Sequence, residues 1–397
     1  MINQKKVLAY ALKNAVEHEG KCLPNSILNS LFHEGLEKKQ VKEIMPLIQE
    51  TTKKVNNLSL EQQETQLKKL KNELSHRKER QGLPEIPVKN KVISRMSPSP
   101  SGPLHLGHIL TILPNFLYAQ KYGGEFYIRI EDTNPENIYE PAYKMIREEA
   151  KWICKNKVKF VIQSERIPLY YTYAEKLINK KAAYVCECDP EKFKTLLLKK
   201  KECPCRKLDK KEQLQRWKKM LDSTYKQGEA VLRFKSDIKD PNPAMRDFPL
   251  ARINETPHPL QKKKYRVWPL MNLAVTTDDI EQGMTHIIRG KDHKDNGKRQ
   301  KMIYKTLGKE KQYPWTAYIG RMRITDMELS ATKTRTAIEQ GKFTGWDDER
   351  LLTAASLKKK YPPELFWKLA EQRGISEVDK VIDKKEFYHL LEVLEKQ

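Results

Sequence analysis

The sequence has no long apolar run, few cysteines and no uninterrupted apolar segment near its start. Without a run of about 18 apolar residues, it offers no candidate membrane-spanning helix. Six cysteines in 397 residues exclude a disulfide-rich scaffold. The opening "MINQKKVLAYALKNAVEHEG" mixes charged with apolar side chains, which excludes a signal peptide. These absences predict a cytoplasmic protein, and the length suffices for several domains.

Positive charge is in clear excess. Lys and Arg number 76 against 52 Asp and Glu, a formal net charge of +24. Basic surfaces attract polyanions because neutralised phosphates release their counterions. A nucleic acid partner is therefore expected, and the alternatives are a solvated lysine-rich surface or binding to anionic lipid. No amphipathic anchor stands out, so no membrane partner is expected.

The N-terminal segment, residues 1–76, is predicted to be helical. "VLAYALKNAVEHEG" has apolar residues at helical spacing, closed by Gly20. "SILNSLF" and "VKEIMPLIQETTKKVNNL" continue the pattern, and Ser59 with Gln62 predicts a capping box for a further helix that ends at Leu74. "RKERQGLPEIPVKNK" is charged and contains prolines, so a linker is expected at 77–90.

Strand and helix patterns alternate after this linker. "VISRM" and "GGEFYIRIED" predict strands, each followed by a helix pattern. "EAVLRFKSD" and "THIIRGKDH" predict later strands, and residues 356–397 are predicted to be helical. This order is typical of an α/β fold with a doubly wound parallel sheet.

Two histidines follow the first predicted strand in "SPSPSGPLHLGHIL". His105 and His108 fall in the first turn of a predicted helix, where free N–H groups and a positive partial charge favour phosphate. Gly107 between them leaves room for a flat group such as adenine. The pair alone leaves three possibilities open: a nucleotide site, two surface histidines, or a zinc pair without a third ligand nearby in sequence.

Five segments in order resemble a known family. "SRMSPSPSGPLHLGH" resembles the "HIGH" signature of class I aminoacyl-tRNA synthetases, in the form of the glutamyl and glutaminyl enzymes. The later blocks of that subfamily resemble "FYIRIEDTNPE" (126–136), "AVLRFKSDIKDPNPAMRDFPLARI" (230–253), "VWPLMNLAVTTDDIEQGMTHIIRGKDH" (267–293) and "GWDDERL" (345–351). The N-terminal helices and the clustered cysteines are similar to the archaeal type of glutamyl-tRNA synthetase.

The resemblance implies a ligase that activates L-glutamate with ATP and Mg²⁺ and transfers it to the 3′ end of tRNA. His105, Gly107 and His108 would bind ATP, and both histidines would be catalytic. The fold would be a Rossmann-like catalytic domain carrying an insertion. The expected boundaries are 1–76 for the N-terminal helices, 77–90 for the linker, 91–185 and 236–322 for the two catalytic halves, 186–235 for the cysteine-rich insertion that binds the acceptor end, and 323–397 for the lysine loop and a helical stem-contact segment.

Two arginines favour a glutamate pocket over a glutamine pocket. By resemblance, Arg95 faces the substrate side chain, and Arg289 matches a position where the glutamyl enzymes carry arginine. A carboxylate can pair with both guanidinium groups, whereas a neutral amide would leave buried charge uncompensated. The resemblance also implies that Glu131 binds the α-ammonium group and that Ser97 and Ser99 hydrogen-bond the amino acid.

Four of the six cysteines cluster in "CECDPEKFKTLLLKKKECPCR". Two Cys-x-Cys pairs, Cys186 with Cys188 and Cys203 with Cys205, can close a tetrahedral tetrathiolate site. A zinc ion held by four thiolates would be structural, because no coordination position stays open. Redox pairs or free thiols are the alternatives. The similar cluster in the archaeal-type enzymes favours one zinc ion.

The chain departs from the family pattern at two places. Class I enzymes carry a "KMSKS" signature whose lysine binds ATP phosphates, but in "RITDMELSATKTRTAIEQG" Glu328 and Ala331 occupy the lysine positions. Lys333 is therefore the predicted catalytic, ATP-binding lysine. Met271 stands where many relatives have a tyrosine in the fourth block.

No segment of the sequence matches the β-rich anticodon-binding region of the archaeal-type enzymes. A truncated chain, one product of a split gene, or a natural short paralogue that glutamylates another acceptor would each explain this. An inactive or partner-dependent tRNA-binding paralogue is the alternative function. The expected partners are tRNA, L-glutamate and ATP. The chain is expected to be a monomer, alone or with a separate C-terminal anticodon-binding partner.

Overall fold

The computed structural model describes residues 3–74, 82–325 and 330–396. The chain divides into two compact units, Met1–Glu79 and Arg80–Gln397. Each unit buries apolar side chains of its own. None of the helices in the described part of the chain has the length and apolarity needed to cross a bilayer.

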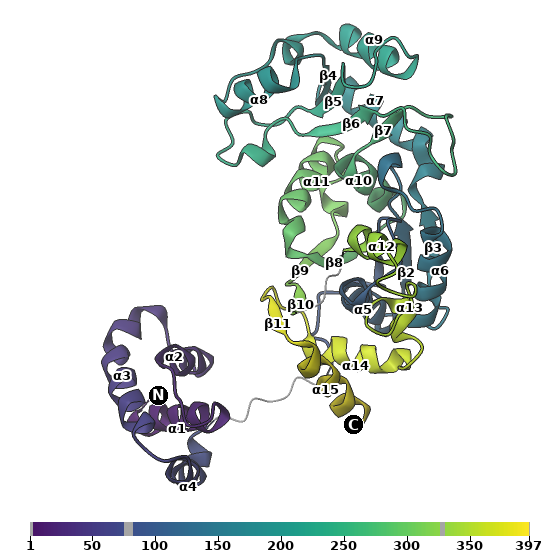
Figure 1. Ribbon diagram of the computed structural model, residues 1–397. Helices are drawn as coiled ribbons and strands as arrows, with labels where there is room; N and C mark the ends of the chain where they lie inside the picture. Colours follow the sequence, from purple (N-terminus) through teal and green to yellow (C-terminus); the bar gives the residue numbers. More distant parts are fainter. Residues whose placement is uncertain (1–2, 75–81, 326–329, 397) are drawn as a thin grey trace. The chain divides into compact units, whose positions relative to one another are not determined.

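The first unit is helical, as predicted. Its elements are α1 (Gln4–Glu17), α2 (Pro24–His33), η1 (Lys38–Gln40), α3 (Val41–Asn56), α4 (Leu60–Leu70) and η2 (Lys71–Glu73) (Figure 1). Val7, Leu12 and Ala15 lie on the predicted apolar face of α1 and are fully buried. The predicted capping box is confirmed, because Ser59 N donates to Gln62 Oε1 at 3.0 Å and Gln62 N donates to Ser59 Oγ at 3.3 Å.

Parallel strands form the centre of the second unit. β1 (Ile93–Met96), β2 (Glu125–Ile130) and β3 (Lys159–Ile162) pair in parallel, as do β8 (His286–Gly290) and β9 (Trp315–Ile319). β8 lies beside β1, where Thr285 N donates to Ile93 O at 2.9 Å. The strands β3-β2-β1 and β8-β9 form two hydrogen-bonded sheets, and their parallel pairing confirms the predicted α/β class. β1 and β8 lie side by side where the order of the strands reverses, as it does in doubly wound folds.

Asn115 fills the place where β1 and β8 separate. It lies on α5 (Leu106–Lys121), the helix that follows β1 and packs on β1, β2 and β8. Its buried Oδ1 accepts from Ser94 Oγ at 2.6 Å and from Ile288 N at 2.9 Å, and its Nδ2 donates to Ile288 O at 2.8 Å. These bonds satisfy strand backbone and fix the two strand ends relative to each other. Ligands of doubly wound folds bind in the crevice at such a reversal.

Further helices and turns flank the parallel strands. They are η3 (Pro135–Asn137), α6 (Ala142–Ile153), η4 (Gln163–Arg166), α7 (Ile167–Asn179), α10 (Met271–Glu281), η7 (Lys291–His293), α11 (Lys294–Thr306) and η8 (Glu310–Gln312). Ile109, Leu113 and Phe116 of α5 share one buried cluster with Phe126 and Ile128 of β2. This packing fixes the start of α5 against the strand ends.

An antiparallel sheet with its own buried cluster lies between α7 and α10 in the sequence. β4 (Ala183–Cys186), β5 (Val231–Phe234), β6 (Pro249–Ile253) and β7 (Val267–Pro269) pair in that order. The segment from β4 to β5 contains α8 (Pro190–Leu198), η5 (Pro204–Lys207) and α9 (Lys210–Leu221), and η6 (Pro243–Met245) precedes β6. The four clustered cysteines fall in this segment, which begins at the last residue of β4.

The C-terminal part of the second unit combines helices with short strands. Its elements are β10 (Met322–Ile324), α12 (Ala331–Glu339), α13 (Ala354–Leu357), α14 (Pro363–Arg373), β11 (Lys380–Ile382) and α15 (Lys384–Glu395). The prediction of an entirely helical end over 356–397 is wrong at β11, which pairs in parallel with β10. Three residues are too few to show a strand period, so only the pairing partner defines this strand.

The predicted linker at 77–90 is only partly described. Its residues 77–81 lie outside the described residues. The later part of this segment belongs to the second unit and packs within it: Tyr118 Oη donates to Pro84 O at 2.5 Å, and His286 Nε2 lies 2.8 Å from Pro87 O. This segment therefore leads directly onto α5 and β8.

Candidate active site

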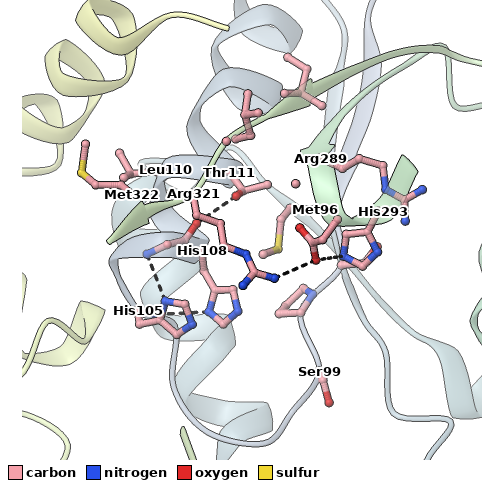
Figure 2. A pocket seen from close by; sticks show the side chains of 18 of the residues that line it. Met96, Ser99, His105, His108, Leu110, Thr111, Arg289, His293, Arg321 and Met322 are labelled. Atoms are coloured by element: carbon pink, nitrogen blue, oxygen red, sulfur yellow. Dashed lines mark hydrogen bonds and ion pairs between the residues drawn. The ribbon is translucent and has the colours of Figure 1, made fainter. Parts of the chain in front are cut away.

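A cavity of about 1080 Å³ lies at the carboxyl ends of β1 and β8 (Figure 2). Its volume is at the upper end for ligand sites, enough for a nucleotide and a small second substrate. The predicted site residues that it brings together are Arg95, Ser97, Ser99, His105, Gly107, His108, Glu131 and Arg289, and Met271 also lines it. Among the described residues, Lys333 and the clustered cysteines are not part of its lining.

One part of the cavity, the histidine end, consists of His105, Gly107 and His108. His105 caps α5: its Nδ1 accepts from Gly107 N at 3.1 Å, while His108 Nδ1 accepts from His105 N at 3.3 Å. The two rings stack with centroids 3.8 Å apart. Burial lowers the pKa of His105 to about 4 and the pKa of His108 well below its usual value. Because both Nδ1 atoms accept, the neutral rings carry their protons on Nε2 as hydrogen-bond donors.

Close packing fixes the loop that carries the histidine pair. Leu104 N donates to Glu149 Oε2 at 2.6 Å, and Leu104 O accepts from Ala354 N at 2.8 Å. Glu149 is 2% exposed, and burial raises its pKa to about 8. A Cβ added at Gly107 would lie 3.0 Å from the His105 ring. Glycine there allows the ring to rest against the backbone.

The other part of the cavity, the arginine end, consists of Arg95, Glu131 and Arg289. Arg95 Nε and Nη2 donate to the two carboxylate oxygens of Asp279, both at 2.7 Å. Arg289 Nη1 donates to Gln300 Oε1 at 2.9 Å, and its buried Nε has no partner in the described part of the chain. Burial and the nearby guanidinium of Arg95 lower the pKa of Arg289. An anion beside Arg289 would compensate this buried charge.

Glu131 is the carboxylate of the arginine end. It follows β2 directly, and its backbone N donates to Pro98 O at 2.9 Å. Burial raises its pKa, and the guanidinium groups of Arg129, Arg95 and Arg289 oppose that rise. A bound ammonium group would favour the ionised carboxylate. Glu131 is therefore suited to hold an amine.

Sequence reasoning missed an acidic pair beneath the arginine end, Asp278 and Asp279 on α10. Asp279 Oδ1 also accepts from Arg129 Nη2 at 2.7 Å, and Asp278 accepts from Arg166 Nε at 2.7 Å and from Tyr170 Oη at 2.8 Å. Both carboxylates are buried. The available signal was two adjacent acids in the otherwise uncharged stretch "MNLAVTTDDI". Charged residues in a buried helix need partners nearby.

The loop after β8 and the strand β10 supply further lining residues that sequence reasoning missed. Asp292 Oδ2 lies 3.3 Å from Arg321 Nη2 and 3.7 Å from His293 Nε2. Figure 2 shows Arg321, which precedes β10, reaching toward the space between the histidine pair and His293. The sequence signal for Asp292 and His293 was the polar run that ends a predicted strand, "RGKDH". Residues at the carboxyl ends of parallel strands line ligand sites.

The predicted lysine, Lys333, lies in the first turn of α12 with an exposed side chain. Ser330 caps this helix and accepts from Lys333 N at 3.4 Å. A Cβ added at Gly102 would lie 2.9 Å from Ala331 Cβ, so the start of α12 packs against the loop after β1. Glu328 lies outside the described residues. The role of Lys333 stays a prediction.

The four clustered cysteines form a compact group of thiols. Their ligand atoms all lie within 4.8 Å of one another, with Cys186 Sγ 3.9 Å from Cys203 Sγ and Cys188 Sγ 3.7 Å from Cys205 Sγ. Arg216 Nη1 lies 3.4 Å from Cys205 Sγ. Four thiols at this spacing are the donor set of a closed zinc site.

The chain is similar in sequence to known proteins. The profile of the tRNA synthetases class I (E and Q), catalytic domain, matches residues 91–396. The chain is 43% identical over 388 residues to the glutamate--tRNA ligase of Thermococcus kodakarensis, covering 95% of this chain and 67% of that protein. The ligase of the same name from Methanocaldococcus jannaschii is 39% identical over 379 residues, covering 95% of this chain and 68% of that protein. The chain thus spans about two thirds of the length of these relatives.

Solved structures show the same fold. A glutamate tRNA ligase from Elizabethkingia meningosepticum, in complex with its amino acid, matches with a TM-score of 0.51 and 21% identity over 71% of this chain and 60% of that chain. A glutamate-tRNA synthetase from Elizabethkingia anophelis matches with a TM-score of 0.52 and 20% identity over 76% of this chain and 70% of that chain. The profile match and the archaeal relatives, which agree with the resemblance of the five sequence blocks, show that the chain belongs to the family of class I tRNA synthetases for glutamate and glutamine.

Proposed function

We propose that the chain is a glutamate–tRNA ligase that activates L-glutamate with ATP and transfers it to the 3′-terminal adenosine of tRNA. The observation that carries the proposal is one cavity with two unlike parts, an uncharged histidine end and a cationic arginine end. Relatives near 40% identity with the name glutamate--tRNA ligase support it. The alternative of an inactive tRNA-binding paralogue is not favoured by these relatives.

The arginine end suits glutamate because it carries one positive charge in excess. The arginine end and the layer beneath it together contain four guanidinium groups and three carboxylates: Arg95, Arg129, Arg166 and Arg289, with Glu131, Asp278 and Asp279. L-Glutamate bears one net negative charge and restores balance, whereas zwitterionic glutamine does not. The γ-carboxylate would bind Arg289 and Arg95, and the α-ammonium group would bind Glu131. Ser97 and Ser99 would hydrogen-bond the amino acid.

The histidine end suits the phosphates of ATP. The Nε2–H groups of His105 and His108, with the amides at the start of α5, are donors that need no protonation. Adenine would lie against Gly107, and Lys333 would add a cation to the triphosphate. Mg²⁺ would enter with ATP and neutralise phosphate charge. The structure offers donors rather than general acids at this end, so positioning and electrostatic stabilisation would supply most of the rate.

Two displacements complete the proposed reaction. The α-carboxylate oxygen of glutamate attacks the α-phosphorus of ATP, and the bond to pyrophosphate breaks. A hydroxyl of the terminal adenosine then attacks the carbonyl carbon of the adenylate, loses its proton and releases AMP. The cavity would hold the reacting groups of the first step between its two ends. The catalytic halves, 91–185 and 236–322, would carry this chemistry.

The cysteine-rich insertion, 186–235, is proposed to bind the tRNA acceptor end. Lys210, Lys211, Lys218 and Lys219 are exposed along α9. Their contacts with phosphates would weaken as salt rises, because releasing counterions into a more concentrated salt solution gains less entropy. Residues 323–397 would contact the tRNA stem. The chain would act as a monomer, alone or with a separate anticodon-binding partner.

We assign one structural zinc ion to Cys186, Cys188, Cys203 and Cys205. Elemental analysis of protein purified without added metal should find about one ion per chain. Cys186→Ser should lose the ion, whereas Cys154→Ser, which removes a buried thiol of the other core, should keep it. Chelation should weaken acceptor-stem binding before glutamate binding. Less than about a tenth of an equivalent, with four freely titratable thiols, would reject the assignment.

Glutamate-dependent ATP–pyrophosphate exchange, measured with tRNA present, tests the function. We expect exchange with glutamate and little with glutamine, followed by formation of glutamyl-tRNA. Exchange with glutamine alone would reject the specificity. Tight tRNA binding without any glutamyl ester, with or without a C-terminal partner, would instead indicate the tRNA-binding paralogue.

A further inference from the structure

Asp279 holds the arginine that is expected to meet the substrate side chain. Arg95 Nε and Nη2 donate to Asp279 Oδ1 and Oδ2, each at 2.7 Å, in a bidentate pair that is 4% and 3% exposed. A bidentate pair fixes the plane of a guanidinium group, which a single contact does not. The remaining nitrogen, Nη1, has no hydrogen bond to any described residue. Because Arg95 lines the cavity, its Nη1 is the nitrogen that can donate to a ligand.

Asp279 is itself fixed from a second side. Its Oδ1 also accepts from Arg129 Nη2 at 2.7 Å, and Arg129 Nη1 donates to Gln282 Oε1 at 3.0 Å. Burial would raise the pKa of Asp279, but the guanidinium groups of Arg95 and Arg129 hold it below its usual value. The carboxylate is therefore ionised and has little freedom to turn. Because two hydrogen bonds join Arg95 to this carboxylate, the guanidinium of Arg95 is also held in one orientation.

We propose that Asp279 is a positioning residue for amino-acid selection, acting through Arg95. It does not line the cavity and would not touch glutamate. Its role would be to aim Arg95 Nη1 at the γ-carboxylate, so that this carboxylate meets an oriented donor in addition to Arg289. This inference rests on the proposed glutamate specificity and adds the residue that orients one of its two cations.

The neighbouring Asp278 provides a matched control. It lies one position earlier on α10, is fully buried and accepts from Arg166 and Tyr170, but it has no hydrogen bond to Arg95. Asp278→Asn and Asp279→Asn remove the same charge from the same helix. Only Asp279→Asn removes the bidentate partner of Arg95.

The test is the ratio of kcat/KM for glutamate to that for glutamine, with dissociation constants of both amino acids as a second readout. Losing the orientation of one charge-assisted contact should lower the glutamate-to-glutamine ratio in Asp279→Asn by about tenfold to a hundredfold. The ratio in Asp278→Asn should not fall, because this variant leaves the bidentate pair of Arg95 and Asp279 in place. The KM for ATP should change little in either variant.

The direction of the change separates orientation from charge. Removing a carboxylate makes the pocket more positive, which alone would favour glutamate over glutamine. A ratio that rises, or that falls equally in both variants, would overturn the positioning role. Absence of glutamate-dependent exchange in the wild-type protein would instead reject the proposed function. These two failures are therefore distinguishable.

A second variant covers the case in which Asp279→Asn does not fold. Arg95→Lys keeps the positive charge but cannot be held at two points by Asp279. Its glutamate-to-glutamine ratio should fall by about as much as in Asp279→Asn. Where both variants fold, the double variant should fall little further, because the two changes remove one interaction. A wild-type ratio in Arg95→Lys, or full additivity in the double variant, would contradict the proposal.

Discussion

Half-buried histidines form one end of the cavity and buried arginines the other, and only the second end is charged. At the histidine end, burial lowers both imidazole pKa values, and the hydrogen-bond partners of Nδ1 are backbone amides rather than carboxylates. At the arginine end, burial lowers the pKa of Arg289, and the carboxylates of Asp279 and Glu131 oppose that fall. Partners, rather than burial alone, decide which form of a buried titratable group is stable. One end can therefore select a charge while the other supplies donors at any neutral pH.

Removing Arg289 should have the largest effect, because it deletes the cation that lacks a carboxylate partner in the described structure. Arg289→Ser should lower kcat/KM for glutamate by about a hundredfold or more, since breaking a buried charge pair costs about 3–5 kcal/mol. Glutamine activation should fall less. The measurement is the ratio of kcat/KM for glutamate to that for glutamine. Arg299→Ser is the control, because the Arg299 guanidinium binds Ala244 O.

The thermal stability of Arg289→Ser tests separately whether Arg289 serves the fold or the substrate. Arg289 is a buried cation with an unpartnered Nε, so its removal should leave the midpoint of thermal unfolding unchanged or raised without substrate. Equal losses for both amino acids, with a lower midpoint, would show that Arg289 serves the fold rather than selection.

His108→Ala tests the uncharged end. The imidazole donors should matter more to the charge that develops on the leaving pyrophosphate than to bound ATP. We expect kcat for exchange to fall by about tenfold to a hundredfold, with a smaller rise in the KM for ATP. His389→Ala, at an exposed position of α15, should leave both constants unchanged. An unaltered rate in His108→Ala would remove the pair from the site.

Glu149, behind the histidine end, should make stability fall as pH rises. Its pKa is about 8 when folded against 4.5 for the free group, so between these values the unfolded chain releases a proton that the folded chain keeps. Lys358 opposes this shift and Glu148 adds to it. Glu149→Gln removes the titration, and its free energy of unfolding relative to wild type should improve by about 3 kcal/mol between pH 5 and pH 8. Denaturant unfolding at several pH values checks this, with exposed Glu395→Gln as control.

The smallest effect should be the pH response of exchange itself. Because burial keeps His105 and His108 neutral above about pH 5, the imidazoles should contribute less than about a twofold change in kcat between pH 6 and pH 8. A profile that falls with a midpoint near 6.5 and loses that midpoint in His108→Ala would show that the pair titrates. The histidine end would then also carry charge near neutral pH, and the difference in charge between the two ends would be smaller.

Local signals were sufficient for much of this protein. Helical spacing and the Ser59 capping box predicted the first unit because both features act within one or two turns. The order of strand and helix patterns predicted the α/β class, and the family resemblance named eight of the residues that line the cavity. β11 escaped because a three-residue strand shows no period. Asp279 and Asn115 escaped because their partners lie far away in the sequence.

The sequence by itself determined the family, the elements and the residue types at each end of the cavity, because these depend on local composition and on the order of motifs. It could not determine the protonation state of His108, the orientation of Arg95 or the rise in the pKa of Glu149. Each of these depends on burial and on contacts between segments up to 184 residues apart, as between Arg95 and Asp279. Only the folded chain removes water from these groups and places their partners, and desolvation and partners set the free energy of a buried charge.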